Sequence, residues 1–137
     1  MGIKTVGRFV RTTPLTLAAG ENVTFLNNVT SNCALENQNG QILIKKPGLY
    51  MIYANFIATS ATTGSTATIQ LQENGVNVPG ATASATIDVA NGIENLSFNA
   101  IATVKGNCGN GFAVFSFINE DGDMTYNNAN VIVEKIA

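Results

Sequence analysis

The sequence predicts an all-β protein, folded as a two-sheet antiparallel sandwich of the jelly-roll kind. Three observations predict this fold class. Residues typical of strands and turns (Thr, Val, Ile, Asn and Gly) are abundant, while Leu, Glu, Lys and Arg are scarce. Turn-forming stretches recur at the spacing expected between the strands of a sandwich. Some of the segments between them alternate between apolar and polar residues.

The expected strands follow one another along the chain between these turns. In order, they cover Gly7 to Thr12, Thr16 to Ala18, Asn22 to Asn27, Ala34 to Glu36, Gln41 to Ile44, Tyr50 to Thr59, Thr66 to Glu73, Thr82 to Val89, Glu94 to Val104, Gly111 to Asn119 and Ala129 to Lys135. The breakers between them are AAGEN, NQNG, KKPG, TTGS, ENGVNVPG, ANG, KGNCGNG, NEDGD and NNAN. About ten strands in a domain of this size imply two packed sheets.

The strands are of two kinds. TATIQLQE alternates cleanly, so we expect Ile69 and Leu71 to point inward from a sheet with one solvated face. In contrast, Tyr50 to Thr59 and GFAVFSFIN are largely apolar on both faces, and we expect these two strands to share the second sheet. The sequence contains no amphipathic helix to cover that sheet, so the expected cover is another copy of the subunit.

Composition bounds the possible functions. The 137 residues fit one domain, residues 1–137, in which residues 1–20 form an N-terminal arm and the first strands. Charged residues make up 12% of the chain, against about 25% in typical soluble proteins. The net charge of −2 argues against nucleic-acid binding, which would need a basic patch. No stretch has the length of a membrane helix or the apolar core of a secretory signal, so we expect a protein made in a cytoplasm or a mature fragment.

Catalysis is not expected, and neither is a cofactor. The chain has no histidine, which removes the commonest general base and every Ser-His or Cys-His arrangement. Cys33 and Cys108 lie far apart in the sequence without a metal-ligand spacing, so two unpaired thiols are favoured over a disulfide. The Gly-rich KGNCGNGF lacks the ending of a phosphate-binding loop.

Two sets of charged residues are weak site candidates. Glu120, Asp121 and Asp123 in NEDGD offer oxygen ligands for calcium, but the spacing is not that of an EF-hand, and Asp-Gly favours a plain turn. Lys4, Arg8 and Arg11 form a basic N-terminal arm. A solvated arm is the simpler interpretation, and docking onto an acidic partner surface is the sharper one.

Certain motifs resemble a known family. PGLYMIYANF, followed by QENGVNVPGA and by NNANVIVEK, resembles segments of the tumour necrosis factor and complement globular-head superfamily. The resemblance is closest to bacterial and phage members, including the C-terminal domains of collagen-like surface and spore-coat proteins, and extends over roughly residues 33–137. It implies a ten-stranded jelly roll that associates as a compact trimer.

The resemblance and the apolar pattern together lead to a functional expectation. We expect a non-enzymatic homotrimeric structural protein on a virion surface, as a phage capsid decoration or a fibre-type head, because collagen-type Gly-X-Y repeats are missing. The alternative is the trimeric head of a bacterial cell- or spore-surface protein that binds a receptor or a glycan. In that case, outward loops at Thr59 to Thr66 and Asn74 to Ala81 would make the contacts.

Five aromatic residues are expected to build the core and the threefold interface. They are Tyr50, Tyr53, Phe56, Phe115 and Phe117. If Tyr53 or Phe117 faces the axis, an aspartate in its place would break the trimer.

Overall fold

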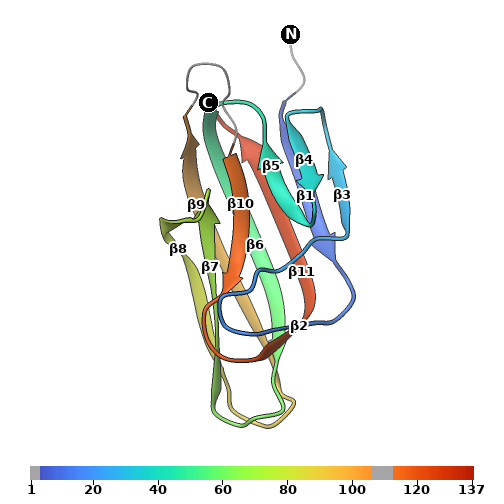
Figure 1. Cartoon of the computed structure of the whole chain (residues 1–137), viewed down its shortest axis with the longest axis vertical. Coiled ribbons are helices and arrows are strands. Elements are labelled where there is room, and N and C mark those ends of the chain that lie inside the picture. Colours follow the sequence, from blue (N-terminus) through green and yellow to red (C-terminus); the bar gives the residue numbers. More distant parts are fainter. Residues whose placement is uncertain (1–3, 106–112) are drawn as a thin grey trace.

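The computed structural model describes residues 4–105 and 113–137, which contain eleven strands (Figure 1). The strands are β1 (Val6–Arg11), β2 (Leu15–Leu17), β3 (Asn27–Thr30), β4 (Leu35–Gln38), β5 (Gln41–Ile44), β6 (Gly48–Thr59), β7 (Ser65–Glu73), β8 (Val76–Ile87), β9 (Ile93–Val104), β10 (Ala113–Asn119) and β11 (Met124–Lys135). The predicted all-β class is confirmed.

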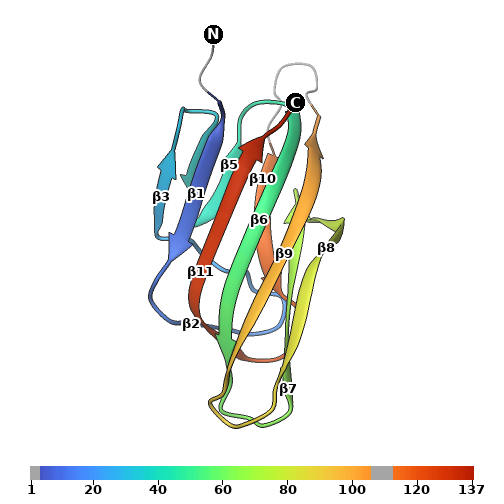
Figure 2. The ribbon, with the colours of Figure 1, turned by 180° about the vertical axis from the view of Figure 1, so that it is seen from behind.

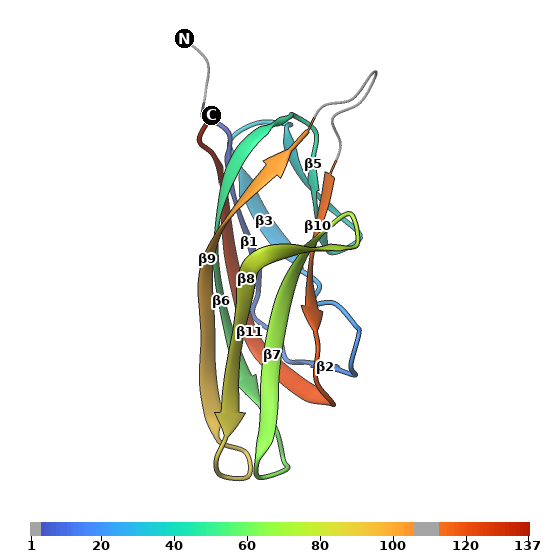
Figure 3. The same ribbon diagram turned by 90° about the vertical axis from the view of Figure 1, so that its left-hand side faces the viewer.

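The strands form two antiparallel sheets packed face to face (Figure 3). The six-stranded sheet has the order β3-β1-β11-β6-β9, and β2 also pairs with β11. The five-stranded sheet has the order β4-β5-β10-β7-β8. The start of β1 and the end of β11 lie at one end of the sandwich, while the β6–β7 and β8–β9 connections lie at the other (Figure 2).

Two of the predicted turns are tight Asn-Gly hairpins. Asn39 and Asn74 have φ values of 53° and 54°, and the glycines that follow them have 85° and 83°. Positive φ at both central residues is the geometry of the type I′ turn, which matches the twist of the flanking strands. These turns set the β4–β5 and β7–β8 pairings, in which Gln38 lies opposite Gln41.

The core is filled by the inward side chains of both sheets. Phe117 of β10 is fully buried, and its ring lies 5.3 Å from that of Phe56 on β6 and 6.1 Å from that of Phe98 on β9. It also contacts Phe25 edge-on at 5.8 Å. Such aromatic contacts add to the free energy gained from burial, so Phe117 holds the two sheets together.

A buried polar network closes one end of the core. The Tyr126 hydroxyl donates to Asn119 Oδ1 at 2.8 Å, and Asn119 Nδ2 donates to the carbonyl oxygens of Leu17 and Ala18, each at 3.2 Å. Burial, reinforced by the negative charge of Asp121, holds the pKa of Tyr126 well above its ordinary value of 10.0. This network ties β2 to the start of β11.

Some strand boundaries differ from those expected. The segment expected as a strand at Asn22 to Asn27 instead makes an isolated bridge from Asn22 to Ile118, and β3 begins only at Asn27. The NNAN stretch, expected as a breaker, lies inside β11, where a register shift between Tyr126 and Asn128 absorbs the irregularity. Polar residues that indicate a turn are tolerated here because the strand bulges.

The expectation that the two doubly apolar strands share a sheet is wrong. β6 lies in the six-stranded sheet and β10 in the five-stranded sheet, so the two face each other across the core. Each strand buries one set of side chains completely and leaves the other set partly exposed. Apolar residues on both faces of a strand therefore indicate neither its sheet partner nor complete burial of both faces within one subunit.

Replacing Phe117 with alanine is expected to lower the free energy of unfolding by about 3–5 kcal/mol, because the lost ring leaves a cavity between the sheets. Chemical denaturation of the variant measures this change. Val89→Ala is the matched control, since that side chain is 68% exposed and its loss opens no cavity. Equal stability of the two variants would contradict this description of the core.

The stability of the protein is expected to fall as the pH rises above about 10, because unfolded tyrosines then ionise while buried Tyr126 keeps its proton. Tyr126→Phe would make that fall shallower, at a cost of about 1–3 kcal/mol at neutral pH from the unpaired Asn119 oxygen. Urea unfolding measured between neutral pH and pH 11 follows both effects. Identical pH slopes for the variant and the parent would show that Tyr126 does not carry the effect.

Candidate functional site

The outward face of the six-stranded sheet is the candidate site, and we call it the six-stranded face. Among the described residues, no strand or helix lies over it, as Figure 2 shows from that side. Its side chains are the alternate residues of β1, β11, β6 and β9 that point away from the core. Strand alternation places them there, since their neighbours in sequence are buried in the sandwich.

One row of side chains crosses the whole six-stranded face. The register places Val29 beside Arg8, Arg8 beside Ile132, Ile132 beside Tyr53, and Tyr53 beside Asn99. Three of these five residues are apolar or aromatic. Val29 is 65% exposed and Tyr53 is 40% exposed, so a subunit on its own presents these groups to water.

The next row is rich in amides. Asn27 lies beside Val10, Val10 beside Asn130, Asn130 beside Asn55, and Asn55 beside Ser97. Apart from Val10, every side chain in this row can donate and accept hydrogen bonds. The six-stranded face therefore combines apolar contact area with uncharged hydrogen-bonding groups.

Asn130 has an unusual environment within this row. Its Oδ1 atom is buried, and it has no hydrogen-bond partner among the described residues. It lies at a shallow hollow of about 280 Å³, whose lining includes Tyr53, Asn55 and Asn99. A buried acceptor without a partner costs free energy, so a donor supplied from outside the subunit would stabilise this position.

The structure divides the five predicted aromatic residues between two places. Tyr50, Phe56, Phe115 and Phe117 are fully buried in the core of a single subunit, and only Tyr53 lies on the six-stranded face. An aspartate at Phe117 would therefore act on folding and not on an interface. The aspartate substitution that tests the interface is therefore the one at Tyr53.

Sequence reasoning missed most of the six-stranded face, although a signal was present. In β9, polar and apolar residues alternate from Asn95 to Ala100, and the outward set of the strand is Ile93, Asn95, Ser97, Asn99, Ile101 and Thr103. That alternation predicts a half-exposed strand.

The basic arm does not act as one group. Arg11 is 9% exposed, and its guanidinium donates to the Thr24 carbonyl oxygen at 3.1 Å, to Thr24 Oγ1 at 3.0 Å and to the Thr13 carbonyl oxygen at 3.0 Å. These bonds engage Arg11 inside the subunit, which does not fit the expected docking role. Lys4 pairs with Glu134 at 2.8 Å, while Arg8 is exposed on the six-stranded face.

The acidic turn carries a structural hydrogen bond. The Thr68 hydroxyl donates to Asp121 Oδ2 at 2.6 Å, which fastens the turn to β7. Within residues 4–105 and 113–137, Glu120, Asp121 and Asp123 do not form a group of three metal-ligating side chains. Cys33 is exposed, and Cys108 lies outside the described residues.

The two loops expected to face outward lie in different parts of the molecule. The β6–β7 loop lies beside the β8–β9 loop, held by hydrogen bonds from Asn91 N to Ser60 O at 2.7 Å and from Gly64 N to Ile87 O at 2.8 Å. Asn74 to Ala81 instead contains the β7–β8 turn, nearer the end that carries the termini (Figure 1).

Comparison with solved structures identifies the fold. The chain is similar to Eiger TNF from S. frugiperda, with a TM-score of 0.74 and 10% identity over 98% of this chain and 93% of that chain. It is similar to murine APRIL, with a TM-score of 0.72 and 9% identity over 98% and 100% of the two chains. It is also similar to the vertex protein P5 of phage PRD1, with a TM-score of 0.61 and 16% identity over all of both chains. The protein therefore has the TNF-like jelly-roll fold.

No protein-family model matches the chain, and no curated protein matches it by sequence. In the part of the chain that the structure describes, no helix has the length and apolar character needed to cross a membrane.

Proposed function

We propose that this protein is a non-enzymatic structural protein that assembles as a homotrimer through its six-stranded face, as a virion surface component of the capsid-decoration or fibre-head type. In this proposal the whole chain acts as one jelly-roll domain. The six-stranded face carries the proposal, because it exposes apolar side chains beside a buried acceptor that has no partner among the described residues.

Association of subunits would both bury the exposed apolar side chains and give the buried acceptor a hydrogen-bond partner. Burying Tyr53, Val29 and Ile101 against a neighbouring subunit removes apolar surface from water, which is the main driving force of protein association. Amide donors from the neighbour would reach the Asn130 oxygen in its shallow hollow. A ring of three copies closes on itself, so no such face is left free to recruit further chains.

A threefold ring is the arrangement that the sequence resemblance implies, and the TNF-like fold agrees with it. The virion role has narrower support. The fold is shared with a phage vertex protein over the full length of both chains, and no histidine is available for ordinary acid–base catalysis. The start of β1 and the end of β11 lie at one end of the sandwich (Figure 1), so a ring could attach to a larger particle by that end and present its loops at the other. Of the predicted docking residues, Lys4 and Arg8 are the exposed ones.

A second candidate function is the trimeric head of a bacterial cell- or spore-surface protein that binds a receptor or a glycan. The observation that favours it is that the β6–β7 and β8–β9 loops are joined by hydrogen bonds at one end of the sandwich. Their mutual hydrogen bonds fix the loop backbones, and a preorganised loop loses little entropy when it binds.

The untagged protein is expected to have a solution mass near three times its 14.3 kDa subunit mass, measured by light scattering. Tyr53→Asp is expected to convert it to a folded monomer, because three like charges would be brought together in a desolvated interface. Thr86→Asp is the matched control, since Thr86 is exposed on the opposite, five-stranded sheet. A Tyr53→Asp protein that remains trimeric would place the interface elsewhere.

The virion role is tested separately, on particles. An antibody raised against the trimer should label the surface of purified phage particles of the parent genome in electron microscopy. Labelling of bacterial cell or spore surfaces, with unlabelled particles, would favour the second candidate instead.

A further inference from the structure

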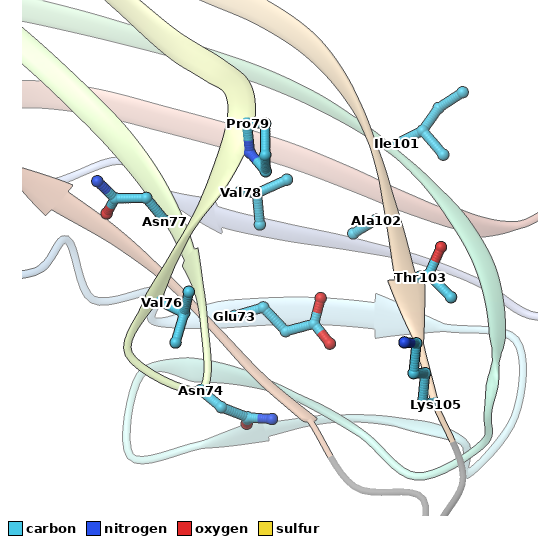
Figure 4. Close-up of a pocket in the computed structure, with 10 residues that line it drawn as sticks. All are labelled: Glu73, Asn74, Val76, Asn77, Val78, Pro79, Ile101, Ala102, Thr103 and Lys105. Carbon is cyan, nitrogen blue, oxygen red and sulfur yellow. The ribbon is translucent and has the colours of Figure 1, made fainter.

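A pocket lies where the β7–β8 turn approaches the end of β9 (Figure 4). Its volume is about 500 Å³, within the range of roughly 300–1,000 Å³ typical of small-ligand sites. Its lining is charged at one end and aliphatic at the other. The residues that carry the argument are Glu73, Val78, Pro79, Ala102 and Lys105.

A β-bulge shapes one wall of the pocket. Val76 and Asn77 pair with Glu73 and Gln72, and pairing resumes where Thr82 lies opposite Gln70, so residues 78–81 of β8 bulge out of the ladder. The Gln70 amide fixes this bulge by donating to the carbonyl oxygens of Val78 at 3.1 Å and Ala81 at 3.2 Å. The wall is therefore held by the subunit itself before any ligand arrives.

Glu73 is the central polar group. Its carboxylate points across the pocket toward the Lys105 side (Figure 4), and within the described residues it has neither a hydrogen bond nor an ion pair. Burial raises the pKa of Glu73 above its ordinary value, while the positive charge of Lys105 acts in the opposite direction. A half-buried carboxylate without donors is a strong acceptor for ligand hydroxyl groups.

The other lining groups complement a ligand with many hydroxyls. Lys105 supplies ammonium donors. Val78, Pro79 and Ala102 offer aliphatic surface. The pocket therefore presents acceptors, donors and an apolar contact within one small volume.

We propose that this pocket binds a saccharide of one or two sugar units. Adjacent sugar hydroxyls can donate to the Glu73 carboxylate while accepting from Lys105, and the C–H face of the ring packs on Pro79. Among the described residues, no aromatic ring lines the pocket, so affinity for a single sugar is in the millimolar range, and several copies on one particle would add to it by avidity.

The saccharide pocket goes beyond the assembly role. Its lining comes from one subunit, so its failure and the failure of the trimer proposal can be told apart. A monomeric solution mass would overturn the trimer without affecting sugar binding by the pocket.

The test is an amide chemical-shift titration of the full chain with glucose, galactose and N-acetylglucosamine as probes. We expect at least one of them to cause saturable shifts at Asn77 and Thr103. Glu73→Ala and Lys105→Met should each weaken that binding about tenfold or more, since each removes a charge-assisted hydrogen bond. Glu94→Ala is the control, because that carboxylate lies on β9 near its other end and should leave binding unchanged.

Other outcomes would overturn the proposal. Chemical-shift changes that increase linearly with the concentration of all three sugars, or that occur at residues outside the pocket, would overturn it. The same holds if alanine or glycine betaine causes saturable shifts there and no sugar does. Unchanged binding by folded Glu73→Ala and Lys105→Met proteins would show that the pocket chemistry is not used.

Discussion

The contact of Phe117 with Phe56, Phe98 and Phe25 joins the two sheets, and the arrangement of the surfaces depends on it. Because these rings fill the space between the sheets, every inward position of β6, β9 and β10 is occupied within one subunit. The outward positions of these strands are then available for contact with other molecules. The apolar content of this chain is thus divided between a complete core and a face that remains open in the single subunit.

The two outward faces differ in chemistry. On the five-stranded sheet, outward residues such as Thr68, Gln70 and Ser84 find hydrogen-bond partners within the chain, for example Thr68 with Ser84 at 2.9 Å. On the six-stranded face, Asn130 keeps a buried acceptor without a partner among the described residues, next to an exposed tyrosine. A surface whose polar groups form hydrogen bonds within the chain is suited to contact with solvent. A surface that leaves a buried acceptor unpaired is suited to binding another molecule.

The fold class could be predicted because it depends on local signals. Turn spacing and Asn-Gly pairs directly indicate strands and hairpins, and both Asn39 and Asn74 adopt the positive φ that such hairpins need. The sheet membership of β6 and β10 could not be predicted, because an apolar pattern indicates burial of a strand but does not identify the strand that pairs with it. The role of Arg11 depends on carbonyl groups that only the folded chain brings near it. The pocket depends on a register shift at Pro79 and Gly80, where the sequence indicates an interruption of the strand but not the wall that the interruption forms.

The position of β11 has a consequence for biosynthesis. Among the described strands β11 is made after all the others, yet it lies between β1 and β6 in the middle of its sheet. A growing chain therefore carries two separate edges with unpaired backbone groups until β11 leaves the ribosome. Asn130 and Ile132 belong to this strand, so the six-stranded face does not exist before then. A contact that uses the complete face therefore has to wait until the chain has been synthesised through β11.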